Sequence, residues 1–296
     1  TLRQIVGADG RVVNANALLM HAVTGLRAVN EIVQIAQFEF GAVACSEAVK
    51  AVIANVRPGM SEFDAVQQMR LGVLPHSCHT MFSSGDKLVG LNSPSGKRLE
   101  KGDPMTAVGY WGGLSSRMGW LVEDEAELPA NVRDYVDRLA GPYFACAAEW
   151  YETIGIGVTG GELDALARRH LDTPFFKLVL NPGHLIHLDE WMNTQVYPGS
   201  KQVFLSGQAV QCDIIPAAGP PYYGANIEDG IALLDEAGRA ELKADFPDVW
   251  GRIEARRAFM GDVLGIRLKP EVLPLSNLAG AMPPYWLSPS RIVSKA

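Results

Sequence analysis

The sequence predicts an α+β fold made of two similar halves. In each half, a long run of apolar residues at helical spacing precedes a stretch rich in β-branched and aromatic residues. The pentapeptides at 61–65 and 161–165 share three identities, a Glu, an Asp and an Ala, at the same place in this order of elements. A repeated order of elements with a repeated short motif indicates two copies of one α+β unit.

The composition is that of a globular protein. The 296 residues are 48% hydrophobic and 20% charged, with a formal net charge of −7, so the chain has enough apolar surface for a core and is not disordered. The negative net charge does not indicate binding to nucleic acid, which usually needs an excess of basic residues. No stretch reaches the roughly 20 uninterrupted apolar residues of a membrane helix, and the first residues lack the layout of a signal peptide. We therefore expect a cytoplasmic protein without nucleic-acid or membrane partners.

The elements of the first half follow from apolar spacing and punctuation. Residues 1–27 form a lead-in segment, and a long amphipathic helix is predicted over 30–56. Pro58 and Gly59 end this helix, and a capping box of Ser61 and Asp64 begins a second one that runs to about residue 70. Turn residues between β-branched and aromatic runs predict strands and hairpins over 74–122.

The second half follows the same order. A helix is predicted over 130–156, and a capping box of Thr159 and Glu162 begins another that runs to about residue 170. Strands are predicted near 176–181, 208–215 and 225–234, followed by a helix over 236–263. The glycine spacing at 155–160 matches a dinucleotide-binding loop, but a helical segment precedes it where that loop needs a strand. A turn between two helices is therefore predicted, without NAD.

The four cysteines show no disulfide spacing, and reduced thiols are expected. Three of them lie in apolar runs and are predicted core residues: Cys45, Cys146 and Cys212. Cys78 differs because His76 and His79 flank it. These three side chains could supply a thiolate nucleophile or metal ligands, or the segment is a polar loop that leads into the strand at 80–82.

Five short segments carry the most specific pattern in the chain. They are the helix break at 56–62, the Gly-Asp turn at 99–103, the Gly-His pair Gly183-His184, the apolar run at 210–216 that ends in Pro216, and the triplet Ile227-Glu228-Asp229. Together and in order they resemble the pita-bread superfamily, which includes methionine aminopeptidase, prolidase, aminopeptidase P and creatinase. The resemblance covers about residues 28–236.

This resemblance implies a pita-bread fold: two pseudo-symmetric α+β halves whose curved antiparallel sheets are covered by helices, with a cleft between them. It also implies a domain division into the segment 1–27, at the end of an N-terminal domain that many relatives carry, a catalytic-type domain over 28–240, and a C-terminal appendage over 241–296. We further expect a homodimer that binds a small molecule or short peptide.

The resemblance implies a metal site that the residues do not match. Metallopeptidases of this superfamily bind two divalent ions with two Asp, one His and two Glu, and His184 and Glu228 match two of these ligands. No carboxylate occurs between 104 and 122, so the two Asp positions fall near Val108 and at Ser116 or Arg117. Ile215 stands where a Glu precedes the proline. We therefore predict no bound metal and no cofactor, because charge and coordination are lost together.

The resulting functional prediction is a metal-independent hydrolase of a C–N bond, as the similarity to creatinase implies. His184 is the predicted acid/base group, and Glu228 orients it or pairs with a substrate cation. Superfamily histidines fall near Asn92 and Trp191, and Arg117 is a predicted carboxylate clamp. The predicted substrate-binding residues are Asn92, Arg117, Trp191, Asp213, Asp229 and His187. Two alternatives stay open: a catalytically dead domain that binds peptides or proteins, and an active Xaa-Pro metallopeptidase.

Overall fold

A computed structural model describes residues 1–70, 72, 75–87, 92–111 and 113–295. Its main element is a seven-stranded antiparallel sheet in the order β1-β2-β3-β8-β6-β5, with β9 also paired to β8. The strands are β1 (Met81–Ser84), β2 (Pro104–Tyr110), β3 (Leu114–Trp120), β5 (His184–Leu185), β6 (Ala209–Asp213), β8 (Ile227–Leu233) and β9 (Val272–Pro274). A separate pair joins β4 (Leu178–Val179) to β7 (Ile215–Pro216).

The two halves meet where β3 pairs with β8. Each half contributes three strands in antiparallel order, β1-β2-β3 from the first and β5-β6-β8 from the second. Nearly every residue of the longer strands is buried, and most of their residues are apolar or small. The predicted strands at 208–215 and 225–234 are confirmed; residue 74, residues 88–91 and residue 112 of the predicted strand-rich segment lie outside the described residues.

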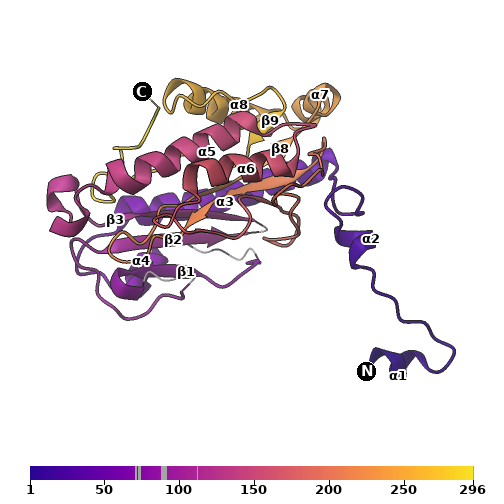
Figure 1. Ribbon diagram of the computed structural model, residues 1–296, viewed down its shortest axis with the longest axis horizontal. Coiled ribbons are helices and arrows are strands. Elements are labelled where there is room, and N and C mark those ends of the chain that lie inside the picture. The colour runs from indigo at the N-terminus through magenta and orange to yellow at the C-terminus, as the bar shows by residue number, and fades with distance from the viewer. Residues whose placement is uncertain (71, 73–74, 88–91, 112, 296) are drawn as a thin grey trace.

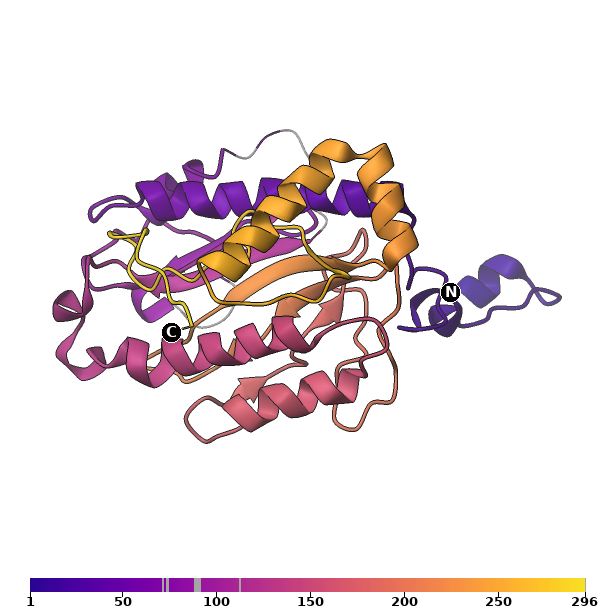
Figure 2. The same cartoon turned by 90° about the horizontal axis from the view of Figure 1, so that it is seen from above.

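Each half also begins with a long helix followed by a shorter, capped one. These are α3 (Ile32–Asn55) and α4 (Glu62–Gln67) in the first half, and α5 (Gly141–Thr153) and α6 (Gly160–Leu171) in the second. The capping boxes of Ser61 with Asp64 and of Thr159 with Glu162 both form. Viewed from above, α3 and α5 run along opposite edges of the sheet, and α8 (Pro247–Asp262) crosses between them (Figure 2).

The helices pack on one face of the sheet, which we call the helix face. A Cβ on Gly109 of β2 would lie 2.7 Å from the backbone oxygen of Cys45 in α3, so the strand approaches the helix at a distance that only glycine allows. In the second half, the hydroxyl of Tyr143 in α5 accepts a hydrogen bond from Ile227 N of β8 at 2.7 Å. The predicted core positions of Cys45, Cys146 and Cys212 are buried, and all four cysteines are free.

The helix predicted over 130–156 is not continuous in the structure. Residues 125–140 form two short 3-10 turns, Glu125–Glu127 and Ala130–Val132, and a π-helical turn, Val136–Ala140, before α5 begins. Pro247 likewise divides the predicted helix at 236–263 into α7 (Glu236–Asp245) and α8, since proline has no N–H for the helical ladder and favours a first-turn position.

The C-terminal residues are built into the sheet rather than forming a separate appendage. β9 pairs with β8 through Ile231–Pro274, Ala232–Leu273 and Leu233–Val272. Trp286 is fully buried against the first half of the sheet. Trp120 N of β3 donates to Pro284 O at 2.9 Å, and Trp286 N donates to Trp120 O at 2.8 Å. The predicted boundary at residue 240 therefore does not separate an independent unit.

The N-terminal segment lies outside the body of the protein. It contains α1 (Leu2–Val6) and α2 (Asn16–Met20), and both project away from the sheet (Figure 1). By length and apolar composition α3 alone, among the described helices, could span a membrane. Half of its tested window is buried and it packs on β2 and β3, which is the position of a core helix.

Candidate active site

The candidate site lies on the face of the sheet opposite the helices, which we call the site face. Strand register places four residues in one row across the sheet: Val108 opposite Ser116, Ser116 opposite Glu228, and Glu228 opposite Asp213. Residues that lie opposite one another in adjacent strands share a face. The sequence left open whether Ser116 or Arg117 lies on the site. The strand register places Ser116, not Arg117, opposite Glu228.

His184 completes a buried cluster with two members of this row. Its Nε2 atom lies 3.7 Å from Asp213 Oδ2 and 3.9 Å from Glu228 Oε1. All three side chains are buried. Neither His184 Nε2 nor Asp213 Oδ1 has a hydrogen-bond partner. Buried polar atoms normally have partners, so these two unpaired atoms mark the cluster as a candidate site for ligand or proton transfer.

Asp213, rather than Ile215, lies beside Glu228 in the sheet. The resemblance placed Ile215 at the position of the second-half Glu, which left His184 and Glu228 as the matched ligands and Asp213 as a predicted substrate-binding residue. Ile215 instead belongs to β7, in the small sheet with β4, and Asp213 stands opposite Glu228. Asp213, a predicted substrate-binding residue, therefore brings a third possible donor atom to His184 and Glu228.

A fourth polar group, Glu190, was not predicted from the sequence. Its Oε1 lies 3.3 Å from His184 Nε2, and its side chain is 24% exposed. It belongs to the loop that follows β5, where neither apolar periodicity nor a short motif gives a signal. The adjacent Trp191 is a predicted site residue, and its ring centroid lies 5.7 Å from that of His184.

Burial and mutual repulsion perturb the two strand carboxyls. Burial raises the pKa of Asp213 well above its usual range, Glu228 adds to this by repulsion, and His184 opposes it. Burial likewise raises the pKa of Glu228, with repulsion from Glu190 and Asp229 added; Arg117 and a hydrogen bond with Gln211 act in the opposite direction. Carboxyl groups with raised pKa values in a buried cluster can exist in the neutral form near neutral pH and donate protons.

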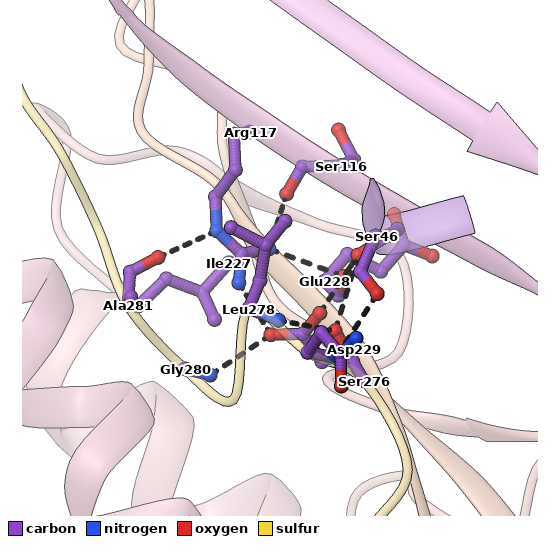
Figure 3. Close-up of polar contacts among 12 residues, drawn as sticks. Ser46, Ser116, Arg117, Ile227, Glu228, Asp229, Ser276, Leu278, Gly280 and Ala281 are labelled. Carbon is purple, nitrogen blue, oxygen red and sulfur yellow. Dashed lines mark hydrogen bonds and ion pairs between the residues drawn. The ribbon is translucent and has the colours of Figure 1, made fainter. Parts of the chain in front are cut away.

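Arg117 and Asp229 lie on the helix face, away from His184. Figure 3 shows them pointing toward each other beside the C-terminal segment. The Arg117 guanidinium forms a fully buried ion pair with Asp229 and donates to the carbonyl oxygen of Ala281 at 2.6 Å. Asp229 also accepts from Ser115 Oγ at 2.8 Å and from Gly280 N at 2.9 Å. The structure therefore does not bring these two predicted site residues to the cluster. Arg117 follows Ser116, and Asp229 follows Glu228, and one position along a strand turns a side chain to the other face.

The structure does not bring the remaining predicted residues, His187 and Asn92, into the cluster. His187 packs edge-on against Phe38, and its Nδ1 lies 3.0 Å from the guanidinium of Arg27. Burial lowers the pKa of His187, and Arg27 adds to this effect. Asn92 is half-buried beside β1, where its carbonyl oxygen accepts from Phe82 N at 3.1 Å.

Apolar side chains occupy the first-half part of the site face. Met81, Val108, Tyr110 and Leu114 form one buried cluster, and Cys78 packs against it. The Sγ atom of Cys78 lies 3.5 Å from His79 Nδ1, so thiol and imidazole are neighbours. Burial raises the pKa of Tyr110.

Among the residues that the structure describes, His184, Asp213 and Glu228 offer a donor set for one divalent cation. Ligand atoms from His184, Asp213 and Glu228 all lie within 4.8 Å of one another, and one imidazole with two carboxylates is a donor set that divalent ions accept. A second ion would need carboxylates at the two first-half positions of the row. Val108 has no donor atom, and Ser116 offers a neutral hydroxyl.

Comparison with solved structures identifies the fold. The Xaa-Pro dipeptidase from Bacillus anthracis is 22% identical with a TM-score of 0.59, covering 72% of this chain and 61% of that one. The prolidase from Pyrococcus horikoshii is 20% identical with a TM-score of 0.58, covering 71% and 61%. The dipeptidase PepE from Mycobacterium ulcerans is 21% identical with a TM-score of 0.59, covering 75% and 60%.

These likenesses confirm the predicted pita-bread fold. The chain spans about three-fifths of the length of these solved structures. No protein-family profile and no curated protein matches the sequence.

Proposed function

We propose that the protein is a hydrolase of the Xaa-Pro peptidase type, which breaks a C–N bond in a small or dipeptide-like molecule. The observation that carries this proposal is the unpaired Nε2 of His184, buried within 3.3–3.9 Å of three carboxylates. An imidazole nitrogen without a structural hydrogen bond is available for proton transfer. The fold it shares with enzymes named as Xaa-Pro dipeptidase and prolidase supports the same chemistry.

The groups of the cluster divide naturally between base and acid. In the proposed reaction a water oxygen attacks the carbonyl or amidine carbon, and its proton passes to His184 Nε2. The C–N bond then breaks, and a neutral Glu228 gives its proton to the leaving nitrogen. Raised carboxyl pKa values favour the acid role, and Glu190 stabilises the protonated imidazole from 3.3 Å.

We propose that this reaction does not require a metal. A cation bound by His184, Asp213 and Glu228 would supply Lewis acidity toward a carbonyl oxygen. It would also occupy the imidazole nitrogen that the proposed proton transfer uses. A pair of ions could activate the water instead, but Val108 and Ser116 do not supply the carboxylates that a second ion would need.

A second candidate is a domain that binds a peptide without cleaving it. The closed character of the cluster favours it: His184 is 1% exposed, and Asp213 and Glu228 are 5% and 6% exposed. In addition, buried apolar side chains occupy the first-half part of the site face, where catalytic polar groups would be expected: Met81, Val108 and Leu114. We also propose a cytoplasmic location, a homodimer and no membrane partner. The net charge of −7 supports the further proposal that the protein has no nucleic-acid partner.

The test is turnover by protein dialysed against a chelator, with and without added Mn²⁺ or Zn²⁺. The substrates are Xaa-Pro dipeptides, creatine and simple amidino compounds. We expect metal-free turnover of at least one class, reduced by about 100-fold or more in His184→Asn. His170→Asn is the matched control, since His170 pairs with Glu149 away from the cluster, and it should leave turnover unchanged.

Each other outcome contradicts this proposal in a defined way. Turnover only with added metal would favour the Xaa-Pro metallopeptidase. Peptide binding without turnover under either condition would favour the binding domain. Turnover that survives His184→Asn would exclude His184 as the acid/base group.

A further inference from the structure

A cavity on the helix face is separate from the candidate active site. It has a volume of about 350 Å³ and lies between the C-terminal half of α3, the α8 helix and the C-terminal segment 277–292. This segment holds Arg117 and Asp229 of the helix face through Ala281 and Gly280 (Figure 3). The sheet therefore lies between this cavity and the His184 cluster.

Most of the cavity wall is apolar. Its apolar residues include Ile53 of α3, Phe259 of α8, and Leu278, Pro283 and Ile292 of the C-terminal segment. A cavity of about 300–1,000 Å³ with a mainly apolar wall and a few polar groups is the usual form of a small-molecule site. This cavity is at the small end of that range, so it suits a ligand with a compact apolar body.

The charged residues described at this cavity are all basic. Lys50 lines it, and a second cavity of about 210 Å³, which shares Phe259 and Asn277 with the first, is lined by Arg252 and Arg256. Among the described residues that line the two cavities there is no Asp or Glu. The whole chain has a net charge of −7, so this gathering of cations is a local feature and does not reflect the composition.

Two carboxylates pair with these cations and compensate them only in part. Glu39, fully buried in α3, accepts from Arg252 at 2.7 and 2.9 Å and from Arg256 at 2.7 Å. Glu47 pairs with Lys50 at 2.8 Å. Among the described residues no third carboxylate forms an ion pair with these three cations. An anion bound at the cavity would therefore supply an opposite charge that the chain does not provide.

We propose that this cavity binds a small carboxylate with an apolar body, such as a medium-chain fatty acid. The apolar wall takes the hydrocarbon part, because removing apolar surface from water stabilises the complex. The carboxylate meets Lys50, with Arg252 and Arg256 in the adjoining cavity. The proposal is independent of the proposed hydrolase, because the cavity and the His184 cluster lie on opposite faces of the sheet.

The experiment compares two probes that have the same hydrocarbon chain and opposite charges, octanoate and octylammonium. Calorimetric titration at neutral pH should give a Kd for octanoate of about 1 mM or below. Octylammonium should bind at least about fivefold more weakly. Amide hydrogen exchange over 277–292 should become slower when octanoate is bound, which locates the ligand on the chain.

Two exposed positions at the cavity test its charge and its volume separately. Lys50→Glu reverses a charge at the cavity and should abolish the preference for octanoate. Ala54→Trp places a bulky side chain there and should weaken octanoate binding by about tenfold or more. Lys243→Glu and Ala244→Trp, both exposed on α7, are the matched controls and should bind octanoate as the wild type does. His184→Asn should also bind it normally.

Four results would overturn the proposal: no binding of octanoate by the wild type, octylammonium binding that is equal or tighter, unchanged octanoate binding in Ala54→Trp, or slower exchange around His184 instead of over 277–292. A wild-type dimer that binds no octanoate and dissociates in Ala54→Trp would show that a second copy of the chain covers the cavity, and it would also overturn the proposal.

Discussion

Two acidic neighbours on one strand, Glu228 and Asp229, show how differently the two faces of this sheet are built. On the helix face, Asp229 is met by a guanidinium, a hydroxyl and a backbone amide, from Arg117, Ser115 and Gly280. On the site face, Glu228 is surrounded by other carboxyls and by a histidine at 3.9 Å. Both side chains are buried.

The difference supports a structural role for Asp229 and the proposed functional role for Glu228. A buried charge that is paired and hydrogen-bonded fixes packing, here between the sheet and the C-terminal segment. A cluster of buried acids with unpaired atoms costs stability, and such sites persist where ligand binding or catalysis requires them. The following substitutions test that contrast, from the largest expected effect to the smallest.

Removing the cation of the helix face should be the most damaging change. Arg117→Leu leaves Asp229 buried without its counter-charge, and we expect the free energy of unfolding to fall by about 3–5 kcal/mol. Urea unfolding followed by circular dichroism measures this. The double substitution Arg117→Leu with Asp229→Asn should recover part of the loss. A loss below about 1 kcal/mol, the size of an exposed pair, would contradict a structural role for the ion pair.

Neutralising an acid of the site face should have the opposite sign. Asp213→Asn removes a carboxyl that burial and Glu228 disfavour in its charged form, so metal-free protein should gain about 1–3 kcal/mol at neutral pH. The thermal midpoint should rise accordingly. Asp229→Asn is the matched control on the other face and should lower it. A lower midpoint for Asp213→Asn would mean that Asp213 is structurally paired.

The same acids predict a pH dependence. In the unfolded chain Asp and Glu titrate near about 4, whereas the folded pKa values of Asp213 and Glu228 are raised. The folded state therefore binds more protons above about pH 4, and the contribution of these two groups to stability falls as pH rises toward their folded pKa values. Subtracting the stability curve of Asp213→Asn with Glu228→Gln from that of the wild type isolates this contribution. A difference that grows in favour of the wild type as pH rises would reverse the assignment.

The smallest effect is expected at the loop that carries Glu190. Arg27→Ala removes a partly exposed ion pair with Asp189, so stability should fall by no more than about 1 kcal/mol. Amide hydrogen exchange over 186–193 should nevertheless become faster, because the N-terminal segment no longer holds the loop. Unchanged exchange over these residues would show that Arg27 does not fix the loop.

Much of the fold was predictable because local signals agreed with the final structure. The capping boxes at Ser61 and Thr159 begin helices as expected. They also show that the true correspondence between halves joins these two caps; the repeated pentapeptide aligned Glu62 with Glu162 instead. Glu62 is buried and accepts from Ser84 and Ser95, whereas Glu162 completes a cap.

The site was predicted only in part, for reasons of register. His184 and Glu228 were found because short motifs surround them. Arg117 and Asp229 were misplaced because one position along a strand reverses the face, and sequence alone does not fix the register between distant strands. Asp213, and not Ile215, faces Glu228 because β6 ends at Asp213 and the proline that anchors the motif lies in β7.

The most direct test of the account compares turnover per folded molecule in two variants of adjoining strands. Glu228→Gln changes the site face, and Ser115→Ala removes one hydrogen bond to Asp229 on the helix face. With the substrate class found for the wild type, the account predicts that Glu228→Gln lowers kcat/KM by about 100-fold or more while remaining folded. Ser115→Ala should keep kcat/KM within about threefold of the wild type. Turnover that survives Glu228→Gln, or that is lost equally in Ser115→Ala, would contradict the assignment of function to the site face.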